Sequence, residues 1–583
     1  MHRAAADAFH HLVGWLDEPT ADAGMHVATD IGWSYHDYSS IARRTASVAA
    51  QLLDGGLARG GVVNIVLPSG VDFVATFFGV LAAGGTPSPL VPPGSLGRSN
   101  EFVGHAARIL EVARPSTVVT SAPFAPLVEA AANLAGRPGA VVVLEPESTD
   151  EWLSVRPAEL ALLQFTSGSS GSPRGVQVPW ENLSANLAMI ERWLGWSGDD
   201  AVATWLPMYH DMGLIGNMLV PVTSQRDLWM MSPEQFVRRP ARWLECFGRH
   251  GATFGASPSF GYQYVVRRVR SESLAGFDFS GWKGAIIGAD RPDARTLMQF
   301  GRLLGPYGFR LDSFLPAYGL AEATLAVSGS RPAARMRAVR PDWDALRLFG
   351  PVPVLEEGWL GEPGVADSGE WILSSGRPLS GLEVSAVDED GGRLAEGWAG
   401  ELLVSGSSVA QGYRGEAREG VSTQFCDDGL RTGDGGFVLD GELFVLGRLG
   451  DSIKVRGRRV FVEDLEARLR AVPGMPADDY VVLPGLSGSP DSLVVLVVKA
   501  DADLATAAAT ALHNLVGDDA VVDVYRASRN ALLRTSSGKP RRRAMWLELA
   551  RGGLDASRLL RSGPSEARTD LVAAQRTGTE DRP

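Results

Sequence analysis

Ten residues rich in Ser, Thr and Gly, at 166–175, form the segment of this chain best suited to chemistry. They read Thr-Ser-Gly-Ser-Ser-Gly-Ser-Pro-Arg-Gly and follow an apolar run at 160–163 that predicts a buried strand. A loop with so little side-chain bulk offers hydroxyl and backbone N–H groups that can cradle a polyphosphate. Taken alone, such a loop is as often an ordinary linker, so its function depends on partners elsewhere in the chain.

Length and composition restrict the class of protein. A chain of 583 residues exceeds one hydrophobic core, and its 45% hydrophobic and 21% charged residues are typical of a folded soluble protein. The net charge of -13 argues against a nucleic-acid surface. Two cysteines, Cys246 and Cys426, are too few for a disulfide framework, which favours a reducing cytoplasm. The amino end does not resemble a signal peptide, and the most apolar window, 71–83, is too short to span a bilayer. We therefore expect a cytoplasmic protein with no membrane span.

The alternation of helical and strand-like patterns predicts an α/β fold. Between about residues 36 and 330, helical periods such as 71–83 alternate with short β-branched runs such as 62–67. This alternation is typical of layered folds with largely parallel sheets. From about 367 to 447, short β-like runs separated by Gly- and Asp-rich turns predict an antiparallel β subdomain. A smaller α/β domain is expected from about 452.

Four further segments accompany the loop at 166–175 in a fixed order. They are Pro-Ala-Tyr-Gly-Leu-Ala-Glu-Ala-Thr at 316–324, Arg-Thr-Gly-Asp at 431–434, a Gly- and Arg-rich segment at 447–459, and Arg-Thr-Ser-Ser-Gly-Lys at 534–539. Together they resemble the motifs of the adenylate-forming superfamily of acyl-CoA synthetases, peptide-synthetase adenylation domains and luciferases. In that superfamily the first of these segments binds adenine and magnesium and the second binds the ribose. The third forms the interdomain hinge, and the fourth carries the catalytic Lys.

Three segments resemble the fatty acyl-AMP ligases in particular. They read WLPMYHDMGLIG at 205–216, AYGLAEATLAVSG at 317–329 and SSGRPLSGLEVSAVD at 374–388. The stretch at 331–370 lies where these ligases carry an insertion that CoA ligases lack. In the family this insertion is thought to brace the small domain against the large one and to disfavour thioester formation with free CoA.

The resemblance implies a division of the chain into a large and a small domain. The large N-terminal domain, 1–447, would hold layered sheets and helices, the insertion at 331–370 and the β subdomain at 371–447. A hinge at 448–451 would lead to a small mobile C-terminal α/β domain at 452–553. The polar composition beyond about residue 554 predicts a disordered tail, 554–583.

The chemistry of this superfamily explains why charged residues are needed. A carboxylate must approach the α-phosphorus of ATP, and two anions at a few ångströms repel by several kcal/mol in a poorly screened site. Cations and oriented dipoles must offset this repulsion. The resemblance makes Lys539 the catalytic cation, Glu322 the ligand of Mg²⁺, and His210 a residue beside the acyl carboxylate. Lys539 also begins a basic run, which would ordinarily be a solvated surface, and His210 could instead be a core or capping residue.

The resemblance also implies a wider set of ligand contacts. Tyr318 would stack on adenine, Asp434 would accept hydrogen bonds from the ribose hydroxyls, and Thr166 would join Glu322 at the magnesium ion. The full nucleotide set is Thr166, Ser167, Gly168, Ser169, Ser170, Gly171 and Arg174, Gly288, Ala289 and Asp290, Ala317, Tyr318 and Gly319, and Asp434, Arg448 and Lys454. Candidates for the acyl pocket, which as large apolar residues are core by default, are Trp205, Met208, Met212, Phe254, Phe260 and Tyr262.

Several positions depart from the family pattern. The phosphate loop usually ends in Lys, whereas Arg174 stands here and can fork onto phosphate oxygens. Gly450 replaces the usual Asp or Lys of the hinge and frees the backbone for rotation. The adenine loop reads Ile-Gly-Ala-Asp-Arg-Pro at 287–292 in place of Asn-Gly-Ala-Glu-Pro, and 256–260 replaces a Gly-Pro-Asn segment near the acyl pocket.

The expected function is ATP-dependent conversion of a carboxylic acid, a fatty acid first of all, to an acyl-adenylate with release of pyrophosphate. The acyl group would then pass to the phosphopantetheine thiol of an acyl carrier protein of a polyketide or peptide synthetase. Three alternatives stay open. The chain could be an acyl- or aryl-CoA ligase, an adenylating enzyme for an unusual acid or a non-thiol nucleophile (nitrite activation included), or a nucleotide-binding protein without catalysis.

Overall fold

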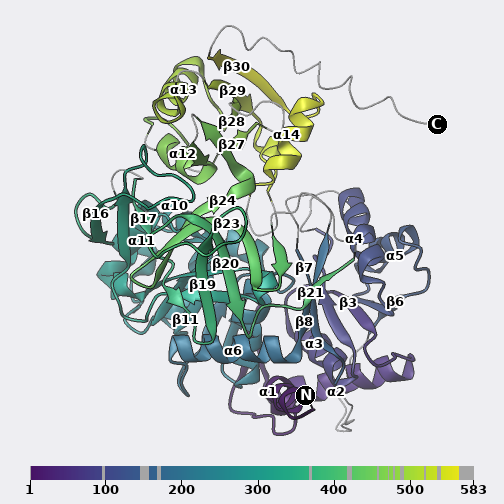
Figure 1. The fold of residues 1–583 in the computed structure, drawn as a ribbon. Helices are drawn as coiled ribbons and strands as arrows, with labels where there is room; N and C mark the ends of the chain where they lie inside the picture. Colours follow the sequence, from purple (N-terminus) through teal and green to yellow (C-terminus); the bar gives the residue numbers. More distant parts are fainter. Residues whose placement is uncertain are drawn as a thin grey trace, which may run out of the picture.

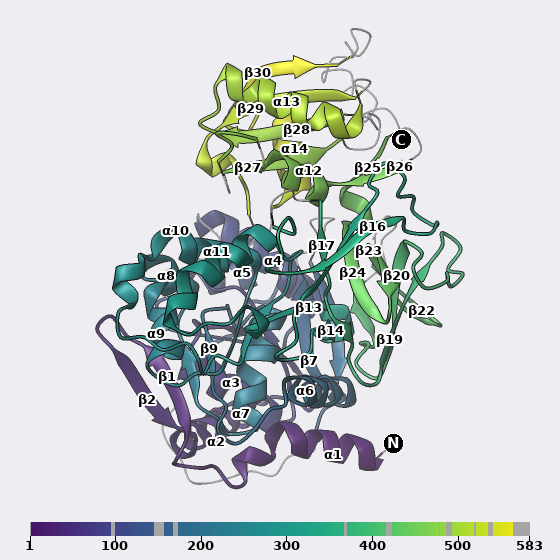
Figure 2. The same ribbon diagram turned by 90° about the vertical axis from the view of Figure 1, so that its left-hand side faces the viewer.

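The computed structural model describes residues 2–94, 99–144, 157–166, 173–366, 370–415, 423–455, 458–470, 472–476, 479–485, 492–517, 520–534 and 540–563. Figures 1 and 2 show a large body with a smaller unit, formed by the C-terminal helices and strands, seated on one side of it. The expected α/β class, with a large and a small domain, is confirmed.

A nine-stranded sheet, in the order β18-β14-β13-β12-β11-β9-β10-β1-β2, forms the centre of the large domain. Its six middle strands are parallel, so their carboxyl ends meet at one edge, where ligands bind in open α/β sheets. Helices on its faces bury a core rich in aromatic side chains. The parallel strands are β13 (Phe314–Gly319), β12 (Gly284–Ile287), β11 (Phe254–Ser257), β9 (Val202–Thr204), β10 (Leu228–Met230) and β1 (Gly24–Ala28), flanked by β14 (Ala326–Gly329), β18 (Arg377–Pro378) and β2 (Trp33–Asp37). The helices α6 (Trp180–Leu194), α8 (Pro233–Arg238), α9 (Ala241–Gly248), α10 (Ser259–Arg268) and α11 (Ala294–Leu304) follow strands of this body.

A second, four-stranded parallel sheet has the order β4-β3-β5-β6. Its helix α3 (Val71–Ala82) is buried along almost its whole length, which explains the apolar window of the sequence as packing inside the protein. Within the described residues, no helix is long and apolar enough to cross a membrane. The other elements here are β3 (Val62–Val66), β4 (Thr86–Pro89), β5 (Thr117–Thr120), β6 (Val141–Val143), α1 (His2–Val13), α2 (Tyr38–Asp54), α4 (Ser99–Ala113) and α5 (Ala125–Leu134).

Antiparallel strands supply the remaining parts of the large domain. The hairpin of β7 (Leu160–Thr166) and β8 (Arg174–Pro179) pairs on its far side with β21 (Gly412–Arg414). The expected antiparallel β subdomain is present as β19 (Leu382–Val387), β20 (Gly400–Gly406), β23 (Gly429–Leu439), β22 (Gln424–Cys426) and β24 (Glu442–Arg448). In the region of the expected insertion, β15 (Arg337–Pro341), β16 (Val354–Trp359) and β17 (Ile372–Leu373) form a three-stranded sheet.

In the part of the small domain that the structure describes, three helices accompany a four-stranded sheet. It contains β27 (Tyr480–Pro484), β28 (Ser492–Val498), β29 (Val521–Ala527) and β30 (Ala556–Ser562), with α12 (Val462–Leu469), α13 (Ala502–Val516) and α14 (Arg542–Ala550). The hairpin β25 (Ser452–Val455) and β26 (Arg458–Phe461) precedes it.

The expectation of disorder from residue 554 onward is wrong for residues 556–562, which form β30 antiparallel to β29. Leu559 and Leu560 pack against the core of the small domain, whereas Arg558 and Arg561 flank the carboxylate of Asp523. An edge strand has one exposed side, and the polar residues on that side resemble the composition of a disordered tail. The sequence therefore did not reveal the strand. Residues 564–583 lie outside the described part.

Candidate nucleotide and acyl site

The expected phosphate loop lies between β7 and β8. Thr166 ends β7 and pairs across the hairpin with Arg174, which begins β8. The hydroxyl of Thr166 and two guanidinium nitrogens of Arg174 are buried and find no partner among the described residues. Buried donors of this kind are costly unless a ligand satisfies them, so the donor set fits an anion such as a phosphate chain.

Arg174 reaches toward the acidic residue of the adenine motif. Its Nη2 lies 3.7 Å from Oε1 of Glu322, and its guanidinium lies 4.3 Å from the ring centre of Tyr413. Glu322 is itself buried, on the short turn after β13, and Tyr413 Oη donates a 2.5 Å hydrogen bond to its Oε1. Burial and the charge of Glu322 raise the pKa of Tyr413, so its hydroxyl stays protonated and continues to donate. A cation and a carboxylate are therefore held side by side at the mouth of the loop.

Tyr318, Asp434 and Arg448, predicted from three separate motifs, form one connected group. Tyr318 Oη donates to Asp434 Oδ2 at 2.6 Å, and Arg448 Nε lies 2.8 Å from Oδ1 of the same carboxylate. The negative charge of Asp434 raises the pKa of Arg448, and burial followed by the same charge raises the pKa of Tyr318 well above its ordinary value. Asp434 is thus oriented by two partners, as a residue that must present a carboxylate to a ligand requires.

The loop that follows β12 has strained backbone and little side-chain bulk. Ala289 adopts a positive φ of 71°, which non-glycine residues rarely do and which is common at ligand sites. A Cβ on Gly288 would lie 3.0 Å from Sδ of Met212, and Ala317 and Gly319 lie on the adjacent strand β13. The carboxylate of Asp290 accepts from the backbone N–H of Ser259 at 2.9 Å, in the first turn of α10. Asp290 therefore satisfies one of the unpaired backbone donors at the start of α10.

His210 lies at the start of a π-helix, Met212–Leu219, and is partly exposed. Its Nδ1 is 2.6 Å from Oδ1 of Asp211, which also accepts from the N–H of Met212 at 2.7 Å. Gln164, on the strand leading into the phosphate loop, donates to the carbonyl of Tyr209 at 3.0 Å. The histidine segment is therefore tied to the same hairpin that carries Thr166 and Arg174.

The apolar candidates divide into two groups. Trp205 stacks on Phe236 with ring centres 4.2 Å apart and meets Phe260 edge-on at 5.6 Å, while Met212 lies beside Gly288. Met208, Phe254 and Tyr262 are buried in the core: Phe254 packs against Trp196, and Tyr262 against Phe300 and Phe314. Trp205 and Met212 are buried in the core as well and only Phe260 is partly exposed, so burial does not separate the two groups.

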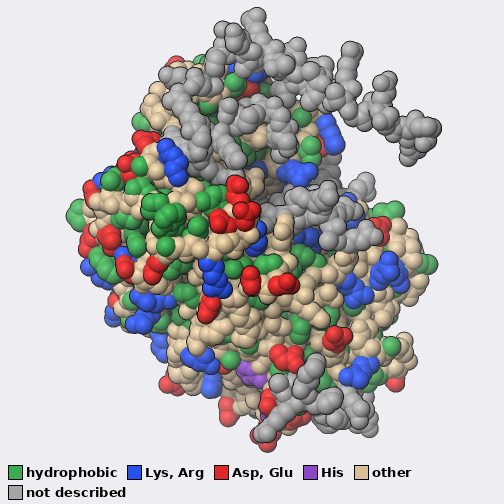
Figure 3. Space-filling view, in the orientation of Figure 1, with side chains coloured by type: hydrophobic (Ala, Val, Ile, Leu, Met, Phe, Trp, Pro, Cys, Tyr) green, Lys and Arg blue, Asp and Glu red, His purple; other side chains and the backbone are tan. Residues whose placement is uncertain are grey.

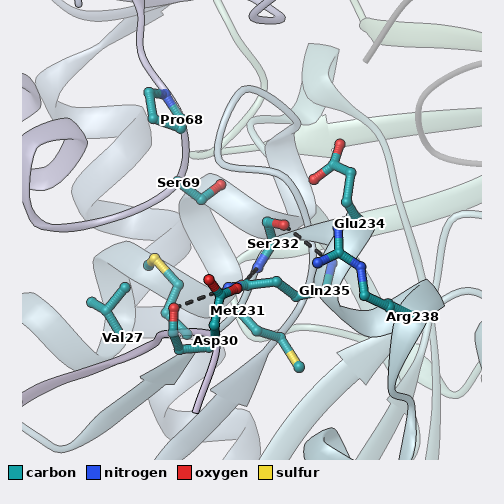
Figure 4. Close-up of a pocket in the computed structure, with 11 residues that line it drawn as sticks. Val27, Asp30, Pro68, Ser69, Met231, Ser232, Glu234, Gln235 and Arg238 are labelled. Atoms are coloured by element: carbon teal, nitrogen blue, oxygen red, sulfur yellow. Dashed lines mark hydrogen bonds between the residues drawn. The ribbon is translucent and has the colours of Figure 1, made fainter. Parts of the chain in front are cut away.

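A pocket of about 340 Å³ lies at the carboxyl ends of β1 and β10. Figure 4 shows Val27 and Asp30 on one side of it and Glu234 and Arg238 on the other. Gln235, which lines the pocket and belongs to the capping box of α8 with Ser232, directly precedes Phe236 of the aromatic stack. None of the residues predicted for the site lines it.

Some predicted residues fall outside the described part, namely Ser167 to Gly171 in the phosphate loop and Lys539; Lys454 lies on β25, but its side chain is not described. Sequence reasoning missed Tyr413, Gln164 and Asp211 as site residues. The described residues contain no group of three or more His, Cys, Asp and Glu side chains suited to a metal ion. A single carboxylate such as Glu322 is nevertheless a usual way to hold Mg²⁺, which takes most of its ligands from substrate phosphates and water.

The layered α/β fold and the residues that converge at the phosphate loop define an adenylate-forming ligase. The family model for AMP-binding enzymes matches residues 17–414, and the chain belongs to that family. It is 31% identical to the long-chain-fatty-acid–AMP ligase FadD26 of Mycobacterium tuberculosis, over 87% of this chain and 90% of the relative. It is 29% identical to the medium-chain-fatty-acid–[acyl-carrier-protein] ligase JamA of Moorena producens, over 89% and 90%. A solved structure from work on fatty acyl-adenylate ligases of E. coli and L. pneumophila superimposes with a TM-score of 0.79 at 28% identity, covering 94% of this chain and 98% of the other.

Proposed function

We propose that this enzyme activates a fatty acid with ATP to give an acyl-adenylate and pyrophosphate, and then transfers the acyl group to the phosphopantetheine thiol of an acyl carrier protein. The observation that carries the proposal is the convergence of Arg174, Glu322 and Tyr413 at the end of the phosphate loop. Those residues come from three distant segments, and an ordinary linker loop would have no need of them.

In the first half-reaction a carboxylate oxygen bonds to the α-phosphorus, and the bond from that phosphorus to pyrophosphate breaks. Arg174, with its two buried unpaired nitrogens, would bind the phosphate chain, and Asp434 would bind the ribose. Glu322 and Thr166 would hold Mg²⁺, which when bound neutralises charge on the phosphate oxygens. His210 would lie beside the carboxylate, and Lys539 would bridge it and the phosphate.

The relatives support a fatty acid and a carrier-protein acceptor. One of them is named as a ligase of a medium-chain fatty acid to acyl carrier protein, and another as a long-chain fatty acid–AMP ligase. The three-stranded sheet at β15–β17 lies where fatty acyl-AMP ligases carry their insertion, which argues against free CoA as the acceptor. The altered adenine loop has a structural explanation in Asp290, which reduces the need to invoke an unusual acid.

Pyrophosphate release across a panel of acids, followed by mass spectrometry with carrier protein or CoA added, tests the proposal. We expect release that depends on medium- or long-chain fatty acid, and acylated carrier protein in preference to acyl-CoA. Acyl-CoA as the dominant product would make the enzyme a CoA ligase. Release only with another acid or nucleophile would reassign the substrate, and ATP binding without any release would leave a protein that has lost catalysis.

The role of Asp434 gives a further prediction. Asp434→Asn keeps the shape of the side chain but removes the charge that orients Arg448 and the strong acceptor for the ribose hydroxyls. Because hydrogen bonds to charged groups contribute about 1.5–3 kcal/mol, we expect the KM for ATP to rise roughly 10- to 100-fold. Asp440→Asn, on the exposed turn between β23 and β24, is the matched control and should leave the KM unchanged. Equal KM values for Asp434→Asn and wild type would remove Asp434 from the nucleotide site.

A further inference from the structure

The loop assigned to adenine also touches the small domain. Arg291, two residues after Ala289, places its Nη1 2.5 Å from Oδ1 of Asp464 on α12. The two side chains are only 13% and 10% exposed, and the guanidinium lies 5.7 Å from the ring centre of Trp343. Arg291 is the residue inserted in this loop relative to the family pattern, and its partner in the structure is Asp464.

A second pair joins the same segment to the other end of the same helix. Asp293 Oδ1 lies 3.1 Å from Nη1 of Arg470, which directly follows α12. Asp293 also caps α11 by accepting from the N–H and hydroxyl of Thr296, so its position on the large domain is rigid. Arg291–Asp464 and Asp293–Arg470, here called the α12 ion pairs, thus hold both ends of α12 to one loop. Figure 2 shows α12 on the side of the small domain that faces the large one.

The small domain also acts electrostatically on the large one through Arg541. Burial first, and then the positive charges of Arg108 and Arg541, lower the pKa of His105 on α4 to about 4. Strand β21 is close to α4, since a Cβ on Gly415 would lie 3.3 Å from Val112, and β21 pairs with the strand that begins at Arg174. The charge of Arg541, which immediately precedes α14, therefore acts on the helix that lies beside β21.

We infer that Arg291 and Asp464 are positioning residues for adenylate formation: the loop assigned to the nucleotide itself holds α12, and so keeps the small domain in the pose in which, under the proposed function, Lys539 would act. The inference rests on the proposed function. Since one loop contacts both the nucleotide and α12, binding of ATP and docking of the small domain favour each other. If acyl transfer requires the small domain to move about the hinge expected at 448–451, the pairs must break first. The α12 ion pairs are distinct from the bracing expected of the insertion region. A separate ion pair, between Arg468 and Glu370, joins α12 to the end of that region.

The test compares Arg291→Gln, Asp464→Asn and the double variant with wild type. Each single variant should lower kcat for pyrophosphate release by roughly tenfold or more, because a truncated buried ion pair leaves its partner unpaired. The double variant should be no slower than the singles, since both remove one interaction. Acyl transfer from supplied acyl-adenylate to carrier protein should keep its wild-type rate or exceed it. Arg310→Gln, which removes the exposed Arg310–Asp312 pair of the large domain, is the control and should change neither step.

Three outcomes would overturn the inference. One is a wild-type kcat in either single variant, and another is additive losses in the double variant. The third is a raised KM for ATP in Arg291→Gln that Asp464→Asn does not share, because Arg291 would then act on the nucleotide directly. Backbone hydrogen exchange of α12 and of residues 288–291, measured without any substrate, gives a readout that does not depend on the proposed function. It should rise in both single variants and not in Arg310→Gln; unchanged exchange would contradict the pairing even if no acid proved to be a substrate.

Discussion

Lys539→Ala is expected to lower the rate of acyl-adenylate formation by about 10²–10³-fold, the size of effect seen when one group that stabilises a developing charge is removed. The physical reason is that carboxylate and triphosphate repel each other, and a compact flexible cation between them offsets that repulsion where it is greatest. The measurement is pyrophosphate release at saturating ATP and acid, with the thermal unfolding midpoint recorded for each variant. The midpoint should stay at the wild-type value.

Arg543→Ala is the matched control for this prediction, because Arg543 belongs to the same basic run and lies exposed on α14. Its rate should equal that of wild type. If the two variants lose activity equally, the run acts through its overall positive charge and Lys539 has no special role. Acyl transfer from supplied adenylate should survive in Lys539→Ala, since only the first half-reaction joins two anions.

Glu322→Gln is expected to lower adenylate formation by a similar factor, about 10²–10³-fold, and to shift its dependence on Mg²⁺ to higher concentration. The substitution keeps the side-chain shape, and the amide oxygen can still accept from Tyr413 Oη. What is lost is the negative charge that would bind the cation and that lies 3.7 Å from Arg174. The measurement is pyrophosphate release titrated with Mg²⁺.

Tyr413→Phe tests how much the orientation of the Glu322 carboxylate contributes to activity, apart from its charge. It removes one hydrogen bond to a charged group and leaves the carboxylate, so we expect a loss of roughly 10- to 100-fold, smaller than in Glu322→Gln and equivalent to about 1.5–3 kcal/mol. A wild-type response of Glu322→Gln to Mg²⁺ would show that the ion is held elsewhere. A loss in Tyr413→Phe as large as that in Glu322→Gln would show that orientation, and not charge, is the larger contribution.

The net charge of the molecule does not explain the expected effects of the Lys539 and Glu322 substitutions. The chain has a net charge of -13, and Figure 3 shows basic and acidic side chains interspersed over one face. An anionic substrate must therefore be attracted by local cations. Among the described residues, Arg174 supplies such a cation beside the phosphate loop.

Sequence by itself determined the fold class and the chemistry-bearing motifs. Alternating periods of strand and helix predict α3 and β3 close to their observed bounds, because hydrophobic periodicity reflects local burial. Glu322, Asp434 and Arg174 could be proposed from motif order alone. Residues 556–562 could not be recognised as β30, because an edge strand with two arginines has the polarity of a solvated tail.

The tertiary structure alone decided which residues touch. Tyr413 reaches Glu322 from 91 positions away, only because β21 pairs with β8. Arg291 meets Asp464 across 173 positions and a domain boundary, and Asp290, predicted as a nucleotide contact, also accepts a hydrogen bond from the first residue of α10. Local patterns specify how each segment buries its own apolar face, but a pairwise contact depends on how separate segments dock. That information is distributed over the packing of both domains, so no single motif contains it.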